Sequence, residues 1–141
     1  MEPVPDKYIP AVQALAERLQ FVRDKVGPVK ILSCYRPAAL NKAVGGSRTS
    51  QHAVAEAVDF TCADFPLALA AILSVEMPAL GQVIYYPEQQ FVHMALPSKK
   101  YPTLTVCYHK PPAFRYRQVP LASVRSFFKD RGVDIPATDE L

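Results

Sequence analysis

The sequence predicts an α+β domain in which helices pack on a small antiparallel sheet. Three observations indicate this class. Apolar residues recur at helical spacing between Val12 and Val26. Two β-rich segments, 82–86 and 91–96, flank a polar stretch at 87–90 that is typical of a hairpin loop, so these two strands are expected to be antiparallel. Fourteen prolines divide the rest of the chain into short elements.

The N-terminal helix is expected from Pro10 to Val26. Proline suits the first turn of a helix, because its missing N–H would have no partner there, and Gly27-Pro28 stops the helix. A short helical turn is expected at 37–44, ended by two glycines. A further helix is expected from a cap at Thr61 or Asp64 to about residue 76, and a last one at 121–129.

Strands are expected at 29–33, 55–60, 82–86, 91–96 and 103–108. In the last helix Val124, Phe127 and Phe128 are expected to face inward. No internal repeat or linker interrupts the chain, so residues 1–141 are expected to form a single domain. Residues 137–141 are expected to be frayed.

Composition excludes several classes of protein. Half of the 141 residues are hydrophobic and 21% are charged, which is ordinary for a globular domain and excludes a disordered tail, a coiled coil or a collagen-like fibre. The longest apolar stretch, 65–75, is shorter than the ~18 residues of a membrane span. Three cysteines without a CxxC pair are expected to be reduced, buried thiols rather than disulfides.

Charge and the N-terminus limit the partners that we expect. The net charge of +3 is too small to indicate nucleic-acid binding, and no membrane contact is expected. Basic clusters at 98–100 and 115–117 are either solvated loop charges or a contact for an anionic surface such as a cell-wall polymer. The chain begins without a basic segment followed by an apolar run, so we expect synthesis in the cytoplasm without a signal peptide.

His52, Asp59 and His93 form a candidate metal site, because two histidines and a carboxylate are a ligand set of catalytic zinc. Seven extended residues would span about 23 Å, so the chain between His52 and Asp59 would have to double back. His93 would then arrive from a neighbouring strand. The alternative is that His52 is a surface loop residue and His93 a hydrogen-bonded histidine on the sheet.

Several ordered sequence blocks surround these residues. The first are Ser33-Cys34-Tyr35-Arg36, Leu40-Asn41, Val44-Gly45-Gly46, Ser50-Gln51-His52 and Ala57-Val58-Asp59-Phe60, followed later by Gln82-Val83-Ile84-Tyr85 and Phe91-Val92-His93. Over about residues 9–96 the chain resembles the zinc D-Ala-D-Ala carboxypeptidases, the M15 peptidases, and in particular their short phage-type members. The resemblance implies the hedgehog-like fold of these peptidases, with 97–141 as an extension of the same domain.

Carried over residue by residue, the resemblance implies that His52, Asp59 and His93 bind Zn²⁺. Arg36 would bind a substrate carboxylate or the carbonyl oxygen under attack, since its planar fork matches an oxyanion. Ser50 would line the pocket or simply form a turn, and Gln90 would contact the substrate. Ser33 and Asn41 would hold the loops that position Arg36 and His52.

The chain departs from the family pattern in two places. Where the family has a glycine between its histidine and aspartate this chain has Ala55, which can adopt a positive φ at a cost of about 1 kcal/mol. The general base usually lies three residues before the last zinc histidine, where this chain has Gln90, or at the end of the preceding strand, where it has Tyr86. The nearest carboxylate is Glu88, which is either the base or a solvated loop charge.

Three functions follow from these observations. The first is a zinc metallopeptidase that hydrolyses a peptide bond in the peptidoglycan stem or cross-link, as a carboxypeptidase or an endolysin. It would act at the cell wall after phage release or as part of a virion. The second is a non-catalytic relative that serves as a cell-wall-binding or virion structural protein, which Gln90 and Tyr86 favour. The third, a chance match in a domain without metal, is disfavoured by the number of ordered blocks.

Overall fold

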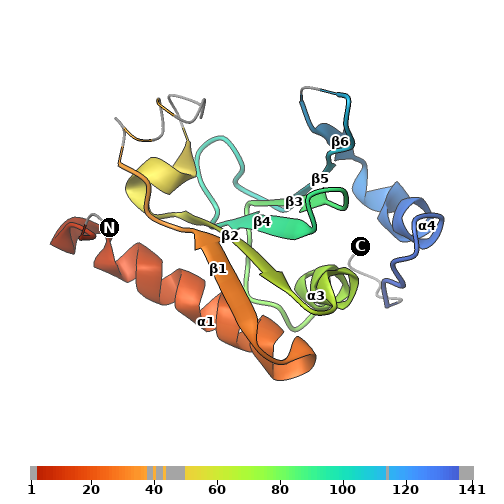
Figure 1. The fold of residues 1–141 in the computed structure, drawn as a ribbon, viewed down its shortest axis with the longest axis horizontal. Helices are drawn as coiled ribbons and strands as arrows, with labels where there is room; N and C mark the ends of the chain where they lie inside the picture. Colours follow the sequence, from red (N-terminus) through yellow and green to blue (C-terminus); the bar gives the residue numbers. More distant parts are fainter. Residues whose placement is uncertain (1–2, 38–39, 41–42, 44–49, 114, 137–141) are drawn as a thin grey trace.

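A computed structural model describes residues 3–37, 40, 43, 50–113 and 115–136. Six strands form one sheet in the order β1-β2-β4-β3-β5-β6 (Figure 1). Every neighbouring pair is antiparallel except β3 and β5, which are parallel. The strands are β1 (Val29–Ser33), β2 (Ala57–Cys62), β3 (Gln82–Tyr86), β4 (Phe91–Ala95), β5 (Thr105–Tyr108) and β6 (Arg117–Val119). The expected α+β class is therefore confirmed.

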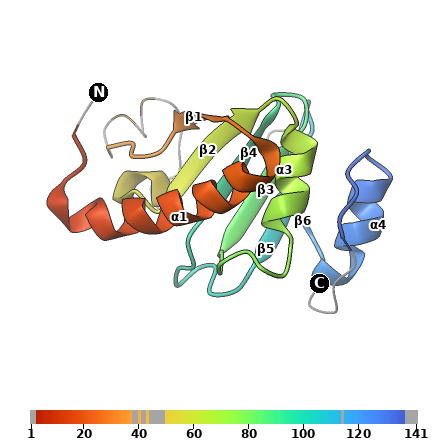
Figure 2. The same ribbon diagram turned by 90° about the horizontal axis from the view of Figure 1, so that it is seen from below.

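Helices α1 (Ile9–Val26) and α3 (Phe65–Ile72) lie together on one face of this sheet (Figure 2). A short helix, α4 (Val124–Lys129), lies beyond β5 and β6, preceded by the 3-10 turn η3 (Leu121–Ser123). Two further 3-10 turns are η1 (Asp6–Tyr8), before α1, and η2 (Gln51–Val54), before β2. None of the described helices is long and apolar enough to cross a membrane.

The core lies between the helices and one face of the sheet. Alternate strand residues point into it, as the two-residue period of a strand requires, and the central ones are Val58, Phe60, Val83, Val92 and Met94. Leu15 and Val22 of α1 and Leu69 of α3 pack against them. Since these residues belong to the helix-covered face, the strand residues between them, including Asp59 and His93, point to the opposite face.

Most of the expected elements are present, with differences at their ends. The strands at 29–33 and 82–86 have the expected bounds, and α1 ends at Gly27, whose φ is +86°. Helix α3 ends at Ile72 rather than near residue 76, because the hydroxyl of Ser74 donates to the carbonyl of Ala71 and Pro78 follows. Its cap is Asp64, whose carboxylate accepts from the N–H of Leu67 at 3.0 Å.

Two elements differ more. Strand β2 begins at Ala57 instead of residue 55, because Ala55 adopts a left-handed conformation at the end of η2. Strand β6 was not expected from the sequence, where its three residues are too few to show a period. The helical turn expected at 37–44 and the frayed end expected at 137–141 lie almost wholly outside the described residues.

Candidate metal centre

Three elements bring the candidate ligands together. Asp59 of β2 and His93 of β4 are directly opposite each other in the antiparallel register, so their side chains lie on the same face of the sheet. His52 arrives from η2, at the end of the loop that follows β1. One ligand atom from each of the three residues lies within 4.8 Å of the other two. The described part of the chain therefore contains a compact group able to hold a metal ion.

The atoms that face one another in this group are nitrogens and oxygens able to bind a metal. Nε2 of His52 is 3.3 Å from one carboxylate oxygen of Asp59, and Nδ1 of His93 is 2.8 Å from the other. The two imidazole rings meet edge to face, with their centroids 5.2 Å apart. His52 is buried, while Asp59 and His93 are partly exposed. The group is thus closed on the His52 side and reachable from the sheet surface.

Asp59 is held in its charged form. Burial by itself would raise the pKa of this carboxyl, but hydrogen bonds from His52 and His93 outweigh that effect and hold the pKa well below its usual range. A carboxylate is the form of aspartate that binds metals. The site therefore offers a ready anionic ligand between two imidazoles.

The backbone after β1 determines which nitrogen of His52 is available. Nδ1 of His52 is 2.8 Å from the carbonyl oxygen of Cys34, which can only accept, so Nδ1 donates to it and Nε2 is the ring nitrogen turned toward Asp59. The N–H of Arg36 in turn donates to the carbonyl of His52 at 2.9 Å. These two bonds join the chain after β1 to η2 and point Nε2 at Asp59, as second-shell contacts do in metal sites.

The segment between His52 and Asp59 does double back, as the metal-site hypothesis required. Ala55 has φ 58° and ψ 30°, and its N–H closes the turn on the carbonyl of His52. The side chain of Gln51 anchors η2 by donating to the carbonyl of Leu96 at 2.9 Å. Ala55 thus takes the positive φ that a glycine would adopt more easily, and the chain still turns directly from η2 into β2.

Ser50 caps this turn. Its hydroxyl oxygen accepts from the N–H of His52 at 3.2 Å, which makes Ser50 the N-cap of η2. Of the two roles that the sequence left open for Ser50, the structure shows the turn-forming one. The role of the hydroxyl in a substrate pocket stays a prediction.

Arg36 is close in sequence and in space to the His52 turn. Its side chain is half-buried, and its Nε atom is buried without a hydrogen-bond partner in the part of the chain that the structure describes. Buried N–H groups nearly always have an acceptor, and a guanidinium carries five donors for carboxylates and similar anions. Arg36 therefore has donor capacity left for an anionic ligand. Asn41, expected to support it, lies outside the described residues.

A comparison of the sequence with protein-family models agrees with this geometry. The model described as Peptidase M15 matches residues 4–95, which is more than half of the chain and includes all three candidate ligands. The chain belongs to the peptidase M15 family. No curated protein matches the sequence. The M15 region ends at the last residue of β4, so β5, β6 and α4 are built by residues outside the match.

In this M15 family member the candidate base Glu88 and the candidate substrate contact Gln90 lie in the β3–β4 turn. Glu88 and Gln90 are both exposed, and the structure does not include Glu88 in the group formed by His52, Asp59 and His93. Gln90 has a positive φ of 63°, and its carbonyl accepts from the hydroxyl of Thr61 at 2.6 Å. The turn is therefore tied to the end of β2 through backbone rather than through its acidic side chain.

Tyr86, at the end of β3 where a family base can lie, is a neighbour of the site. Its ring stacks on Phe91 at 4.3 Å between centroids and touches the ring of His109 at 5.1 Å. Tyr86 pairs with Phe91 and shares the face of His93, two residues further along β4. Burial and the nearby charge of Asp59 raise the pKa of Tyr86, so its hydroxyl is a donor at neutral pH.

His109 directly follows β5 and lies beside Tyr86. It is half-buried against Tyr86, and its Nδ1 is 3.5 Å from the amide nitrogen of Gln89. The two-residue period of each strand could have predicted which face of β3 carries Tyr86 and which face of β5 leads to His109. It could not have predicted that β3 and β5 are parallel neighbours, which is what brings the two side chains together.

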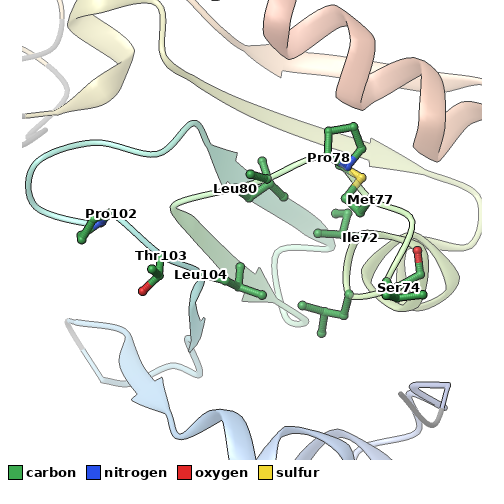
Figure 3. Close-up of a pocket in the computed structure, with 11 residues that line it drawn as sticks. Ile72, Ser74, Met77, Pro78, Leu80, Pro102, Thr103 and Leu104 are labelled. Atoms are coloured by element: carbon green, nitrogen blue, oxygen red, sulfur yellow. The ribbon is translucent and has the colours of Figure 1, made fainter. Parts of the chain in front are cut away.

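A hollow of about 320 Å³ lies elsewhere on the molecule, between the loop after α3 and the loop before β5 (Figure 3). Its lining is mainly apolar and includes Ile72, Met77, Leu80 and Leu104. None of the candidate ligands contributes to it. The candidate metal ligands therefore lie apart from this hollow, on the open face of the sheet.

Proposed function

We propose that the chain is a zinc-dependent peptidase that hydrolyses peptide bonds of bacterial peptidoglycan. The observation that carries the proposal is the convergence of His52, Asp59 and His93 in a chain of the M15 family. The donor set fits zinc, since two imidazoles and one carboxylate leave a fourth position for water. The proton on Nδ1 of His52 also leaves its Nε2 free to bind.

Zinc held by His52, Asp59 and His93 would polarise the scissile carbonyl and lower the pKa of a bound water towards ~7. The side chains of the protein supply the rest of the chemistry. Arg36 binds the substrate carboxylate or the developing oxyanion through its guanidinium, whose Nε has no hydrogen-bond partner among the described residues. The Tyr86 hydroxyl, which stays protonated, is a second donor on the same face of the sheet.

Glu88 is the proposed general base, because it is the carboxylate nearest to His93 along the chain. Its exposed position in the turn leaves it free to approach a bound substrate, and catalytic hydrogen bonds often tighten only in the complex. The proposed substrate is a stem peptide or cross-link, and the proposed setting is the cell wall, reached after phage release or within a virion.

A second function is favoured by one observation. Neither Gln90 nor Tyr86 can act as a base at neutral pH, and Glu88 is outside the metal group. A protein that kept the fold and the metal without hydrolysis would serve as a cell-wall-binding or virion structural protein. The two proposals share metal binding and differ in product formation.

Two measurements test these proposals in turn. Elemental analysis of protein purified without a metal-affinity tag should find about one zinc per chain, and none in His52→Ala. Absence of zinc from the wild type would contradict both proposals. The zinc protein is then incubated with purified peptidoglycan, and new amino groups and the masses of released fragments are measured. The masses distinguish loss of a terminal D-Ala from cleavage of a cross-link.

The base assignment needs a matched pair of variants. Glu88→Gln should lower the rate of amino-group release at least a hundredfold, the lower end of what general-base catalysis contributes, with zinc content unchanged. Glu76→Gln, at another exposed glutamate, should leave the rate unchanged. Full activity in Glu88→Gln would show that another group takes the proton. No release by the wild type would support the non-catalytic alternative.

A further inference from the structure

The basic side chains of this protein are concentrated after the M15 region. Residues 97–131 hold eight of the 16 lysines and arginines but only one of the 13 acidic residues, Asp130. The rest of the chain is thus slightly acidic, although the net charge of the whole is +3. This asymmetry is hidden when charge is counted over the full length.

All eight of these basic residues are exposed: Lys99, Lys100, Lys110, Arg115, Arg117, Arg125, Lys129 and Arg131. The ion pairs of the described residues all involve Asp59 with a histidine, so none of the eight is within 4.0 Å of a carboxylate there. Surface cations in a domain with balanced charges usually have acidic neighbours. Among the residues that the structure describes, these eight cations have no such neighbour.

Two of these cations share one aromatic ring. Arg117 lies over the ring of Phe127 at 4.9 Å, and Arg131 lies over the same ring at 3.6 Å. Lys100, whose ammonium lies 5.4 Å from the ring of Tyr101, belongs to a separate loop. We call Arg117 and Arg131, with the rings of Phe127 and Tyr108 that support them, the cationic row.

The row is anchored on β5, β6 and the end of α4. Arg117 pairs with Tyr108 across the two strands, on the face that carries the core. Arg131 lies 5.1 Å from the ring of Tyr108 and donates to the carbonyl of Phe127 at 2.8 Å. Both guanidinium groups thus lie against rings while their side chains are exposed, so their remaining N–H groups can meet an anion.

The same packing argues against a nucleic acid as the partner. Proteins that hold single strands offer open aromatic faces on which bases stack. In the cationic row the ring of Phe127 has guanidinium groups over it, and Tyr108 is buried. Among the described aromatic residues after residue 96, Tyr116 is the exposed one. The surface thus offers many cations and almost no stacking platform.

We infer that the cationic row binds a phosphodiester polymer without bases, of the polyol-phosphate kind found in cell walls. Phosphate groups match the outward N–H edges of arginine, and a repeating polymer can contact several cations at once. The choice of a wall polymer rests on the proposed function, but binding itself needs neither the metal nor catalysis. Such binding would keep the protein at the wall and leave the metal-bearing face, on the other side of the sheet, uncovered.

The experiment measures binding of the full chain to a soluble poly(glycerol phosphate) by isothermal titration at 50 and 200 mM salt. We expect binding that weakens with salt, since each phosphate contact releases counterions. Arg117→Gln/Arg131→Gln should weaken binding about tenfold and lower the slope of log K against log salt by about 1 per lost contact. Arg125→Gln/Lys129→Gln, at exposed positions on the helix that carries Phe127, gives a second test if the first variant folds poorly.

The control variant is Arg23→Gln/Lys30→Gln, which removes the same charge from exposed positions on α1 and β1. Its affinity should stay within twofold of the wild type. Three results would each overturn the inference. They are an equal loss of affinity in the control and test variants, no binding of the polymer at 50 mM salt, and tighter binding to single-stranded DNA of equal charge. His52→Ala should bind the polymer normally, so failure of the zinc proposal and failure of this one are distinguishable.

Discussion

Nδ1 of His52 lies 2.8 Å from the carbonyl oxygen of Cys34, which fixes the ring of a buried histidine through the backbone. Because a carbonyl can only accept, Nδ1 donates to it, and Nε2 is the nitrogen that faces Asp59 at 3.3 Å. The contact links the end of β1 to the metal-bearing face. A substitution at Cys34 that keeps the backbone path should therefore preserve metal binding.

Zinc should stabilise the folded protein. The unfolded chain lacks the assembled ligand group, so metal binding adds to the free energy of unfolding, by about 2.7 kcal/mol when free zinc is at 100 times its Kd. Thermal unfolding with and without a chelator measures the shift. His52→Ala should unfold at the same temperature under both conditions, and a zinc-dependent shift in that variant would show that the ion binds elsewhere.

Gln90→Gly should stabilise the protein. The backbone of Gln90 is left-handed, with φ 63°, and a side chain there costs roughly 1–2 kcal/mol. Part of that gain is lost to the larger entropy of glycine in the unfolded chain, so we expect a net gain of about 0.5–1 kcal/mol. Urea unfolding measures it.

The neighbouring Gln89 supplies the control, since it lies in the same turn and is exposed but is not among the positive-φ residues. Gln89→Gly should destabilise by about 0.5 kcal/mol, because it adds only unfolded-state entropy. If both glycine variants changed stability in the same direction, the strain at Gln90 would not be the cause.

Gly81→Ala should be strongly destabilising. A Cβ there would lie 2.5 Å from the carbonyl oxygen of Tyr101 and 2.7 Å from that of Leu96, and backbone atoms cannot move aside cheaply. We expect a loss of about 3 kcal/mol, the upper part of the range for overpacking. Gly27→Ala, with φ +86° but open space around it, should cost only about 1 kcal/mol. Chemical unfolding of both variants measures the two losses of stability. A larger loss in Gly27→Ala than in Gly81→Ala would contradict the steric explanation.

Stability should fall between pH 10 and 12. Burial in the core, together with the charges of Tyr108 and Asp64, raises the pKa of Tyr85 from 10.0 to about 12. An unfolded tyrosine ionises first, so the stabilisation is complete below pH 10 and is lost as the pH rises through the folded pKa. The loss from Tyr85 is up to about 2.7 kcal/mol, at 1.36 kcal/mol per unit.

Unfolding free energies at several alkaline pH values test this. Tyr85→Phe should flatten the decline between pH 10 and 12, because phenylalanine has no proton to lose. An unchanged slope would mean that other groups cause the alkaline instability. The variant keeps the ring that packs against Phe128 at 5.7 Å, so the core should stay filled.

The sequence predicted much of the fold, because the decisive signals were local. The helical period of α1 and its proline and glycine ends, the strand at 29–33 and the hairpin at 82–95 are all properties of neighbouring residues. The early end of α3 and the late start of β2 were missed, since a serine side-chain bond and a left-handed alanine decide them. The ordered blocks around His52, Asp59 and His93 also sufficed to indicate the M15 family.

Only the tertiary structure decided how the site is assembled. The sequence alone determined which residues are chemically able to bind a metal, but their meeting depends on the pairing of β2 with β4 and on the hydrogen bond from His52 to Cys34. The parallel pairing of β3 with β5 places His109 beside Tyr86, and the packing of Arg117 and Arg131 on Phe127 assembles the cationic row. These contacts join residues far apart in the chain, and local sequence patterns carry no information about such pairs.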